Sequence, residues 1–180
     1  MLSEDEVKPF SVFISSSQTE FGKLRENLKE RINSEPFVNQ QIMSGVLIEH
    51  KRGEMIAKDI QTEIEKCSIY VGIFGRKESV WTFAEYRAAR ARGLPVLIYQ
   101  FSRRKKPGRP RKTERRGRKS EVQKFLEKEV KSQGIRIRGP YRNEGRLEED
   151  ILRDLTSQMI EMIEEASEVR RTIHKGLFLA

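Results

Sequence analysis

The chain has little cysteine, little histidine and no long apolar run, and each shortage excludes a class of protein. A single cysteine among 180 residues cannot form an internal disulfide, so a reducing, cytoplasmic compartment is expected. His50 and His174 lie far apart without ligand spacing, so no metal site is expected. No apolar run approaches the ~20 residues that span a bilayer, and the acidic N-terminus lacks the apolar core of a signal peptide.

Motifs of several common catalytic sites are missing as well. There is no Walker A sequence and no Gly-x-Gly-x-x-Gly, so neither a P-loop nor a Rossmann phosphate cradle is indicated. No Gly-x-Ser-x-Gly motif marks a hydrolase nucleophile. Cys67 ends a predicted helix, where nothing activates a thiol, and is interpreted as a small buried apolar residue.

The most informative stretch is residues 68–101, which read as strand, loop, helix and strand. The β-branched run around Val71 is typical of a buried parallel strand and ends at Gly75. Residues 81–92 fit a short helix that Gly93 closes, and residues 96–99 fit the next strand. Ligands of such sheets bind beyond the carboxyl ends of the strands. The loop at 76–79 and Glu85 are therefore predicted to lie where a ligand binds.

A second polar loop follows the first predicted strand, residues 10–15. Ser15, Ser16 and Ser17 come in a row, and Ser17 with Glu20 matches a capping box in which the glutamate reaches back to the serine. Two interpretations stay open. The serine hydroxyls and free N–H groups bind a ligand at the positive end of the helix, or the serines only cap and turn the chain.

The remaining segments complete an alternating order of strands and helices. Strands are predicted at residues 46–48 and 135–138, and helices at 17–32, 55–64, 122–130 and 147–170. The long last helix has an apolar stripe, which favours core packing over a coiled coil; its members are Ile151, Leu155, Met159, Met162, Ala166 and Val169. The order predicts an α/β, flavodoxin-like three-layer sandwich with a five-stranded, mainly parallel sheet.

One domain is expected over residues 10–170, with disordered residues 1–9 and a C-terminal tail at 171–180. The net charge of +9 comes from an insert at residues 102–119. It contains 11 of the 36 Lys and Arg residues and one of the 27 Asp and Glu residues, which leaves 25 basic and 26 acidic residues elsewhere. Without apolar periodicity, the insert is expected to be extended and flexible.

The centre of the insert resembles an AT-hook, which has a Gly-Arg-Pro core flanked by basic residues. The resemblance implies that arginines lie along the narrow minor groove of A·T-rich DNA while other cations contact phosphates. A solvated charged loop, or a general polyanion or anionic-membrane contact, is the alternative. The predicted nucleic-acid-binding residues are Arg103, Arg104, Lys105, Lys106, Gly108, Arg109, Pro110, Arg111 and Lys112.

Three pieces of the sequence together resemble the Toll/interleukin-receptor-like (TIR-like) group, including its microbial members that open with Val-Phe-Ile-Ser-Ser. The pieces are VFISSS before a helix, CSIYVGIFG, and ESVWTFAEYRAARARGLPVLIY. The chain is also distantly similar to nucleoside 2-deoxyribosyltransferases. The matched pieces cover roughly residues 10–100, and Ser79, Trp81 and Glu85 follow the Ser-x-Trp-x-x-x-Glu pattern of TIR domains.

The resemblance implies a signalling or defence module that binds a nucleotide or nucleoside, with Glu85 as the catalytic carboxylate of members that cleave NAD. NAD would then be a substrate, and no cofactor is expected. Trp81 and Phe83 would wall a base. Two alternatives remain: Glu85 lies on an exposed helix face beside Arg87, Arg90 and Arg92, or the domain is a non-enzymatic interaction module that binds DNA. Whether the chain forms a homo-oligomer is left open. The implied ligand-binding residues are Ser15, Ser16, Ser17, Gly75, Arg76, Ser79 and Trp81.

Overall fold

The structure is a computed structural model that describes residues 10–34, 43–46, 57–77, 80–102 and 119–177. Strands and helices alternate along these residues. The strands are β1 (Phe10–Ser16), β2 (Met43–Val46), β3 (Ile69–Phe74), β4 (Val96–Phe101) and β5 (Ile137–Tyr141). The helices are α1 (Gln18–Ser34), α2 (Ala57–Glu65), α3 (Val80–Ala91), α4 (Glu121–Phe125) and α5 (Glu144–Leu177).

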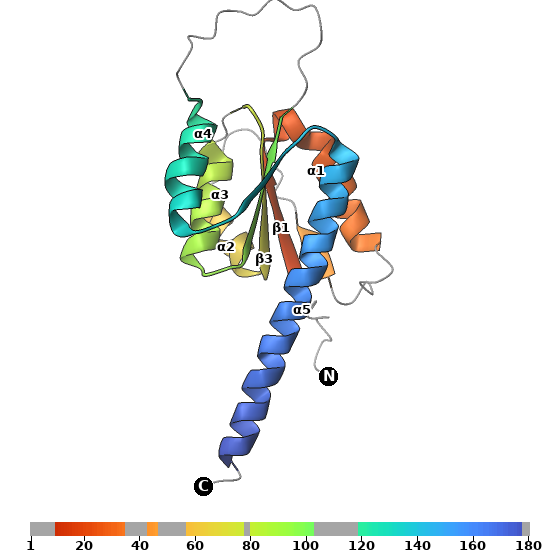
Figure 1. Cartoon of the computed structure of the whole chain (residues 1–180), viewed down its shortest axis with the longest axis vertical. Coiled ribbons are helices and arrows are strands. Elements are labelled where there is room, and N and C mark those ends of the chain that lie inside the picture. The colour runs from red at the N-terminus through yellow and green to blue at the C-terminus, as the bar shows by residue number, and fades with distance from the viewer. Residues whose placement is uncertain (1–9, 35–42, 47–56, 78–79, 103–118, 178–180) are drawn as a thin grey trace, which may run out of the picture.

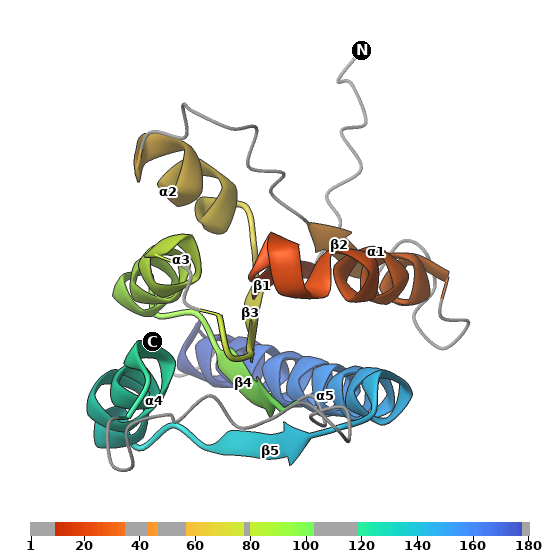
Figure 2. The same ribbon diagram turned by 90° about the horizontal axis from the view of Figure 1, so that it is seen from above.

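The five strands form one parallel sheet in the order β2-β1-β3-β4-β5. Helices α1 and α5 cover one face, and α2, α3 and α4 cover the other (Figures 1 and 2). The predicted flavodoxin-like, three-layer α/β fold is therefore confirmed. β5 lies at the edge of the sheet beside β4 alone, as predicted, but it spans Ile137–Tyr141 instead of residues 135–138.

Two apolar clusters hold the layers together because successive side chains of a strand point to opposite faces. Val12 and Ile14 of β1 pack with α1 and α5, whereas Phe13 between them packs with α2, α3 and α4. Every residue of β3 is buried. A parallel sheet covered on both sides needs such apolar strands, and each fully buried Val, Ile or Phe stabilises the fold by roughly 1.5–3 kcal/mol.

The second strand differs from the prediction. It spans Met43–Val46 instead of residues 46–48, and residues 47 and 48 lie outside the described part of the chain. Packing against α1 selects this segment: the Gly45 N–H donates to Asn33 Oδ1 at 3.0 Å, and a Cβ on Gly45 would lie 3.3 Å from the Cα of Lys29. A close approach of helix and strand favours a small residue here over an apolar run.

Capping residues and glycines in the sequence correctly predicted several helix ends. Ser120 forms the predicted capping box with Gln123 at the start of α4. That helix continues as a short π-helical segment, Leu126–Val130, and a 3-10 turn, Lys131–Gln133. Gly134 then ends it with φ +74°. Gly93 ends α3 in the same way, with φ +77°, and the Leu94 N–H donates to the Ala89 carbonyl. Glycine adopts this left-handed conformation without the steric cost of a Cβ.

Helix α5 is longer than predicted. It runs through Leu177, so residues 171–177 continue the helix instead of forming a tail. Its 34 residues span ~51 Å, whereas the longest strand, β1, spans only ~23 Å. The helix packs on the sheet as far as Met162, which is partly buried, and then projects beyond the domain (Figure 1). Ala166 and Val169, predicted as core residues, are therefore exposed. Over the described residues, no helix is long and apolar enough to cross a membrane.

Candidate functional site

The candidate site lies where the chain leaves β1 and β3. These strands are neighbours, but β1 is followed by a crossover to β2 on one side and β3 by a crossover to β4 on the other. Such a switch point opens a crevice beyond the carboxyl ends of the two strands, where ligands of this fold bind. Ser15 and Ser16 end β1, Ser17 follows it, Gly75 and Arg76 follow β3, and Glu85 lies on α3.

Ser15 and Glu85 meet in the interior. The Ser15 hydroxyl donates to Glu85 Oε2 at 2.5 Å, and Ser15 and Glu85 are 0% and 2% exposed. Glu85 lies on the buried face of α3, whose members recur at helical spacing: Thr82, Glu85, Tyr86 and Ala89. Alternation along β1 directs Ser15 to the same face as Phe13. The interpretation of Glu85 as part of an exposed helix face is therefore wrong.

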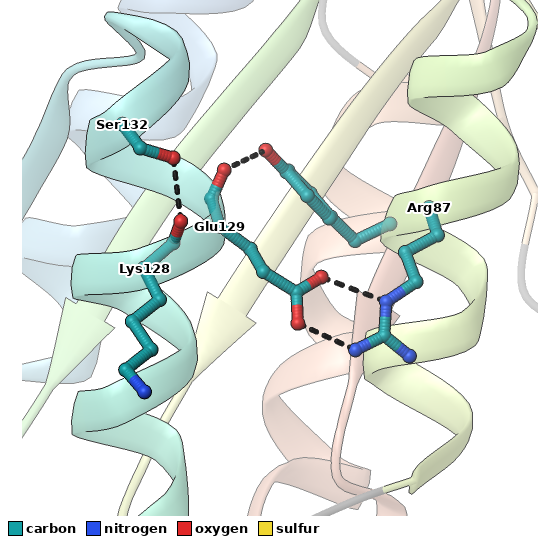
Figure 3. A network of polar contacts seen from close by, with 5 residues as sticks. Arg87, Lys128, Glu129 and Ser132 are labelled. Atoms are coloured by element: carbon teal, nitrogen blue, oxygen red, sulfur yellow. Dashed lines mark hydrogen bonds and ion pairs between the residues drawn. The ribbon is translucent and has the colours of Figure 1, made fainter.

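The arginines of α3 have other partners. Arg87 forms a bidentate ion pair with Glu129, at 2.7 Å from Nε to Oε2 and 2.6 Å from Nη2 to Oε1 (Figure 3). Arg90 donates from Nε to the Gln133 side chain at 2.9 Å. Both bonds join α3 to the turns that follow α4. They connect two neighbouring elements on the outside of the sheet, and the expected cluster of Arg87 and Arg90 with Glu85 does not form.

Tyr70 of β3 is a further polar neighbour, which the sequence analysis did not identify. Burial raises the pKa of Tyr70 well above its usual value, the Glu85 charge raises it further, and a hydrogen bond with Ser15 lowers it. The phenol therefore stays protonated, and its O–H donates to the Thr82 carbonyl at 3.4 Å. Tyr70 lies within an apolar strand, so its hydroxyl was the only feature of the sequence there that could have indicated a polar side chain beside the site.

The three serines do not line one pocket. Ser16 follows Ser15 in β1 and so faces the side of the sheet that carries α1 and α5. It is 3% exposed, and its Oγ has no hydrogen-bond partner within the described residues. The Ser17 hydroxyl lies 3.2 Å from Thr19 Oγ1. Of these three serines, Ser15 is hydrogen-bonded to Glu85, and Ser16 points to the opposite face because a strand alternates its side chains.

Glu20 does not form the predicted capping box. Its carboxylate crosses the switch point and accepts from the Arg76 N–H, at 3.1 and 3.2 Å, and from the Lys77 N–H, at 3.0 Å. Gly75 is the residue that makes room, because a Cβ there would overlap the Glu20 carboxylate. Arg76 therefore enters the site through its backbone, and its side chain is exposed.

The predicted aromatic wall is wrong for Phe83. Its ring stacks on Phe125 with a centroid distance of 4.1 Å and also contacts Phe74, so Phe83 belongs to the packing of α3 against α4. Trp81, in the first turn of α3, is 42% exposed. Ser79 lies outside the described residues. No observation tests the roles predicted for Ser79 and Trp81.

The remaining predictions concern the basic insert, Cys67 and metal binding. All residues of the basic insert that are predicted to bind nucleic acid, at 103–112, lie outside the described part of the chain. Cys67 is buried, as predicted, and burial raises its pKa to about 12. Within the described ranges, no group of three His, Cys, Asp or Glu side chains could hold a metal ion.

The fold of the chain is similar to that of a TIR domain. A solved structure, "Crystal structure of the RPS4 and RRS1 TIR domain heterodimer", is similar with a TM-score of 0.50 and 14% identity. The match covers 84% of this chain and 98% of that one, so the chain has a TIR-like fold. Residues 11–156 match the family described as "Domain of unknown function (DUF4062)", and the chain belongs to that family. No curated protein matches.

Proposed function

We propose that the chain is a cytoplasmic signalling or defence module of TIR-like fold that binds a nucleotide-like ligand and cleaves its N-glycosidic bond at Glu85. One observation supports the proposal above the others: the Glu85 carboxylate lies 2.5 Å from the Ser15 hydroxyl, at the carboxyl end of β1. A carboxylate held in the interior by a hydroxyl, beside the crevice of the switch point, suits a reaction that develops positive charge on a sugar.

The chemistry needs one carboxylate. Breaking an N-glycosidic bond passes through an oxocarbenium-like sugar cation, which a carboxylate stabilises or attacks. Water then adds to the anomeric carbon and releases a proton, so that a hydroxyl takes the place of the departed base. In NAD the nicotinamide is already cationic in the substrate and leaves as a neutral base, so no general acid is required. Ser15 would orient the carboxylate through its hydrogen bond. Because Glu85 is only 2% exposed, the residues that cover it must move when the ligand enters.

The test is release of nicotinamide from NAD by concentrated protein, followed by chromatography. Glu85→Gln keeps the shape of the side chain and removes its charge, and it is expected to lower turnover by ~100-fold or more. Ser15→Ala is expected to lower turnover less. Glu26→Gln is the control, because Glu26 is exposed on α1. If neither NAD nor any nucleoside is turned over, or if Glu85→Gln is as active as wild type, the proposed reaction is wrong.

A non-enzymatic assembly module is the second candidate. The near-complete burial of Ser15 and Glu85 favours it, since two buried groups also serve to hold α3 on β1. The similar TIR structure is titled a heterodimer, which makes pairing with a second copy the natural form of assembly to test. Light scattering across a concentration series measures it. A mass that stays that of one chain at the highest concentration rules out a homo-oligomer in that range.

Nucleic-acid contact through residues 103–112 belongs to the same proposal and rests on their sequence. Eleven basic residues within residues 102–119 favour phosphate contact, and the Gly108-Arg109-Pro110 core favours an A·T-rich minor groove. A gel shift that compares A·T-rich with G·C-rich duplex over a salt series tests both. Equal affinity for the two duplexes contradicts groove selectivity and leaves charge attraction alone.

A further inference from the structure

The Glu20 carboxylate links the two loops beyond the switch point, where a ligand is expected. Glu20 lies in the first turn of α1, which follows β1, and it is hydrogen-bonded to the loop that follows β3. These are the two connections that part at the switch point. Glu20 thus joins the segment after β1 to the loop after β3, at the end of the strands where ligands of this fold bind.

The backbone N–H groups that Glu20 contacts resemble those of an anion-binding site. Two successive backbone N–H groups, of Arg76 and Lys77, point at one carboxylate with distances of 3.0–3.2 Å. Successive N–H groups that converge in a loop bind anions in many phosphate sites. Both residues also carry exposed cationic side chains, and Gly75 leaves the space that the anion occupies.

A second observation comes from the strand between the two loops. Ser16 ends β1 on the face that carries α1, is 3% exposed, and its hydroxyl has no partner within the described residues. A buried hydroxyl usually has a hydrogen-bond partner, and an exception marks a place where a further group belongs. The Ser16 hydroxyl ends β1, and the N–H pair lies in the loop that follows the neighbouring strand β3, so both donors belong to the carboxyl ends of adjacent strands.

We propose that the Arg76 and Lys77 N–H groups bind a phosphate or pyrophosphate group of the ligand, and that Glu20 is a displaceable stand-in that closes the site when the ligand is absent. The idea rests on the proposed function for the nature of the ligand. The bonds of Glu20 are exposed to solvent and are weak for that reason, so a more highly charged anion can replace it. Glu20 must then leave, because two anions cannot share the same donors.

Binding of inorganic pyrophosphate to the full chain, measured by calorimetry, tests the proposal. Glu20→Ala removes the stand-in and is expected to tighten binding by about tenfold, the equivalent of one lost competing interaction. Glu20→Gln, which keeps the shape but not the charge, is expected to fall between. Glu26→Ala removes the same charge from an exposed position of the same helix, so it is expected to change the affinity less than about twofold.

Three outcomes would overturn the proposal. One is a folded Glu20→Ala protein, judged by its circular-dichroism melting curve, that binds pyrophosphate no more tightly than wild type. The second is an equal gain in Glu26→Ala, which would reflect net charge alone. The third is acetate binding as tightly as pyrophosphate, which would exclude a phosphate site. This experiment measures binding and not turnover. A failure to cleave NAD would therefore not contradict the proposed phosphate site, and a failure to bind pyrophosphate would not contradict the proposed cleavage at Glu85.

Discussion

Two buried carboxylates, one on each face of the sheet, form nearly the same contact. Glu85 of α3 accepts a hydrogen bond from Ser15, and Asp154 of α5 accepts one from Tyr99; both are 2.5 Å long. The two acids are 2% and 6% exposed. They differ in position. Ser15 is on β1, at the switch point between β1 and β3, whereas Tyr99 is on β4, one strand further away. Their heights in the sheet are nearly equal, because Ser15 aligns with Ile98 across β3.

Their surroundings differ as well. Asp154 also forms an ion pair with Arg138 of β5 at 2.7 Å, so it ties α5 to β4 and to the edge strand. Burial, followed by the hydrogen bond and the charge of Asp154, raises the pKa of Tyr99. The comparison teaches that burial of an acid does not by itself mark a functional site. The distance of the acid from the switch point is the second criterion. By this criterion Glu85 is suited to contact a ligand, whereas Asp154 is suited to hold the layers together.

The sharpest test of this difference exchanges each acid for its amide. Glu85→Gln is expected to lower nicotinamide release by ~100-fold with little change in stability. Asp154→Asn is expected to keep that activity within about twofold, because it lies on the other face. Activity assays and urea unfolding of both variants measure this. Equal loss of activity in the two would erase the distinction.

The ion pair of Asp154 gives the second prediction. Arg138→Met leaves the buried carboxylate without its cation, and we expect the free energy of unfolding to fall by about 1–3 kcal/mol. The Arg138 side chain is 38% exposed, so the loss is expected to be smaller than for a fully buried pair. In the Asp154→Asn background the same change is expected to cost clearly less. Additive losses in the double-mutant cycle would contradict a coupled pair.

A third helix carboxylate, Glu20, extends the comparison to an exposed site. Gly75→Ala places a Cβ against the Glu20 carboxylate and is expected to cost about 1 kcal/mol through the lost hydrogen bonds. In the Glu20→Ala background the cost is expected to be close to zero. Urea unfolding of the four proteins gives the coupling. A Gly75→Ala cost that is the same in both backgrounds would show that the strain lies elsewhere.

The smallest expected effect is the pH dependence of stability that arises from Tyr141, on the face of the sheet that carries α5. The Tyr141 hydroxyl donates to Asp150 at 2.8 Å, and burial, the hydrogen bond and the Asp150 charge raise the pKa of Tyr141 from 10.0 to about 12. The folded protein holds this proton more tightly, so its contribution to stability is complete below pH 10 and is lost as pH rises toward 12. Tyr141→Phe is expected to flatten that part of the urea-midpoint curve. An unchanged slope would exclude Tyr141 as its source.

Helix α5 shows where a pattern stops predicting burial. Leu155 and Val169 belong to one apolar stripe, yet Leu155 is 1% exposed and Val169 is 58% exposed. The spacing determines which side of the helix is apolar, but the length of the sheet determines how much of that side is covered. Glu20 teaches a similar lesson. The capping-box spacing is correct, but the loop after β3 offers the carboxylate two donors, and the local contact is not made.

The sequence by itself determined the order of the elements, the parallel α/β class, the Ser120 cap and the glycine ends at 93 and 134. These depend on periods of two and 3.6 residues and on contacts within one turn, which short stretches encode. Only the tertiary structure decided that Ser15 meets Glu85, 70 residues later, and that Ser16 does not. Such contacts depend on which strands become neighbours and which way each side chain alternates, and no local spacing contains that information.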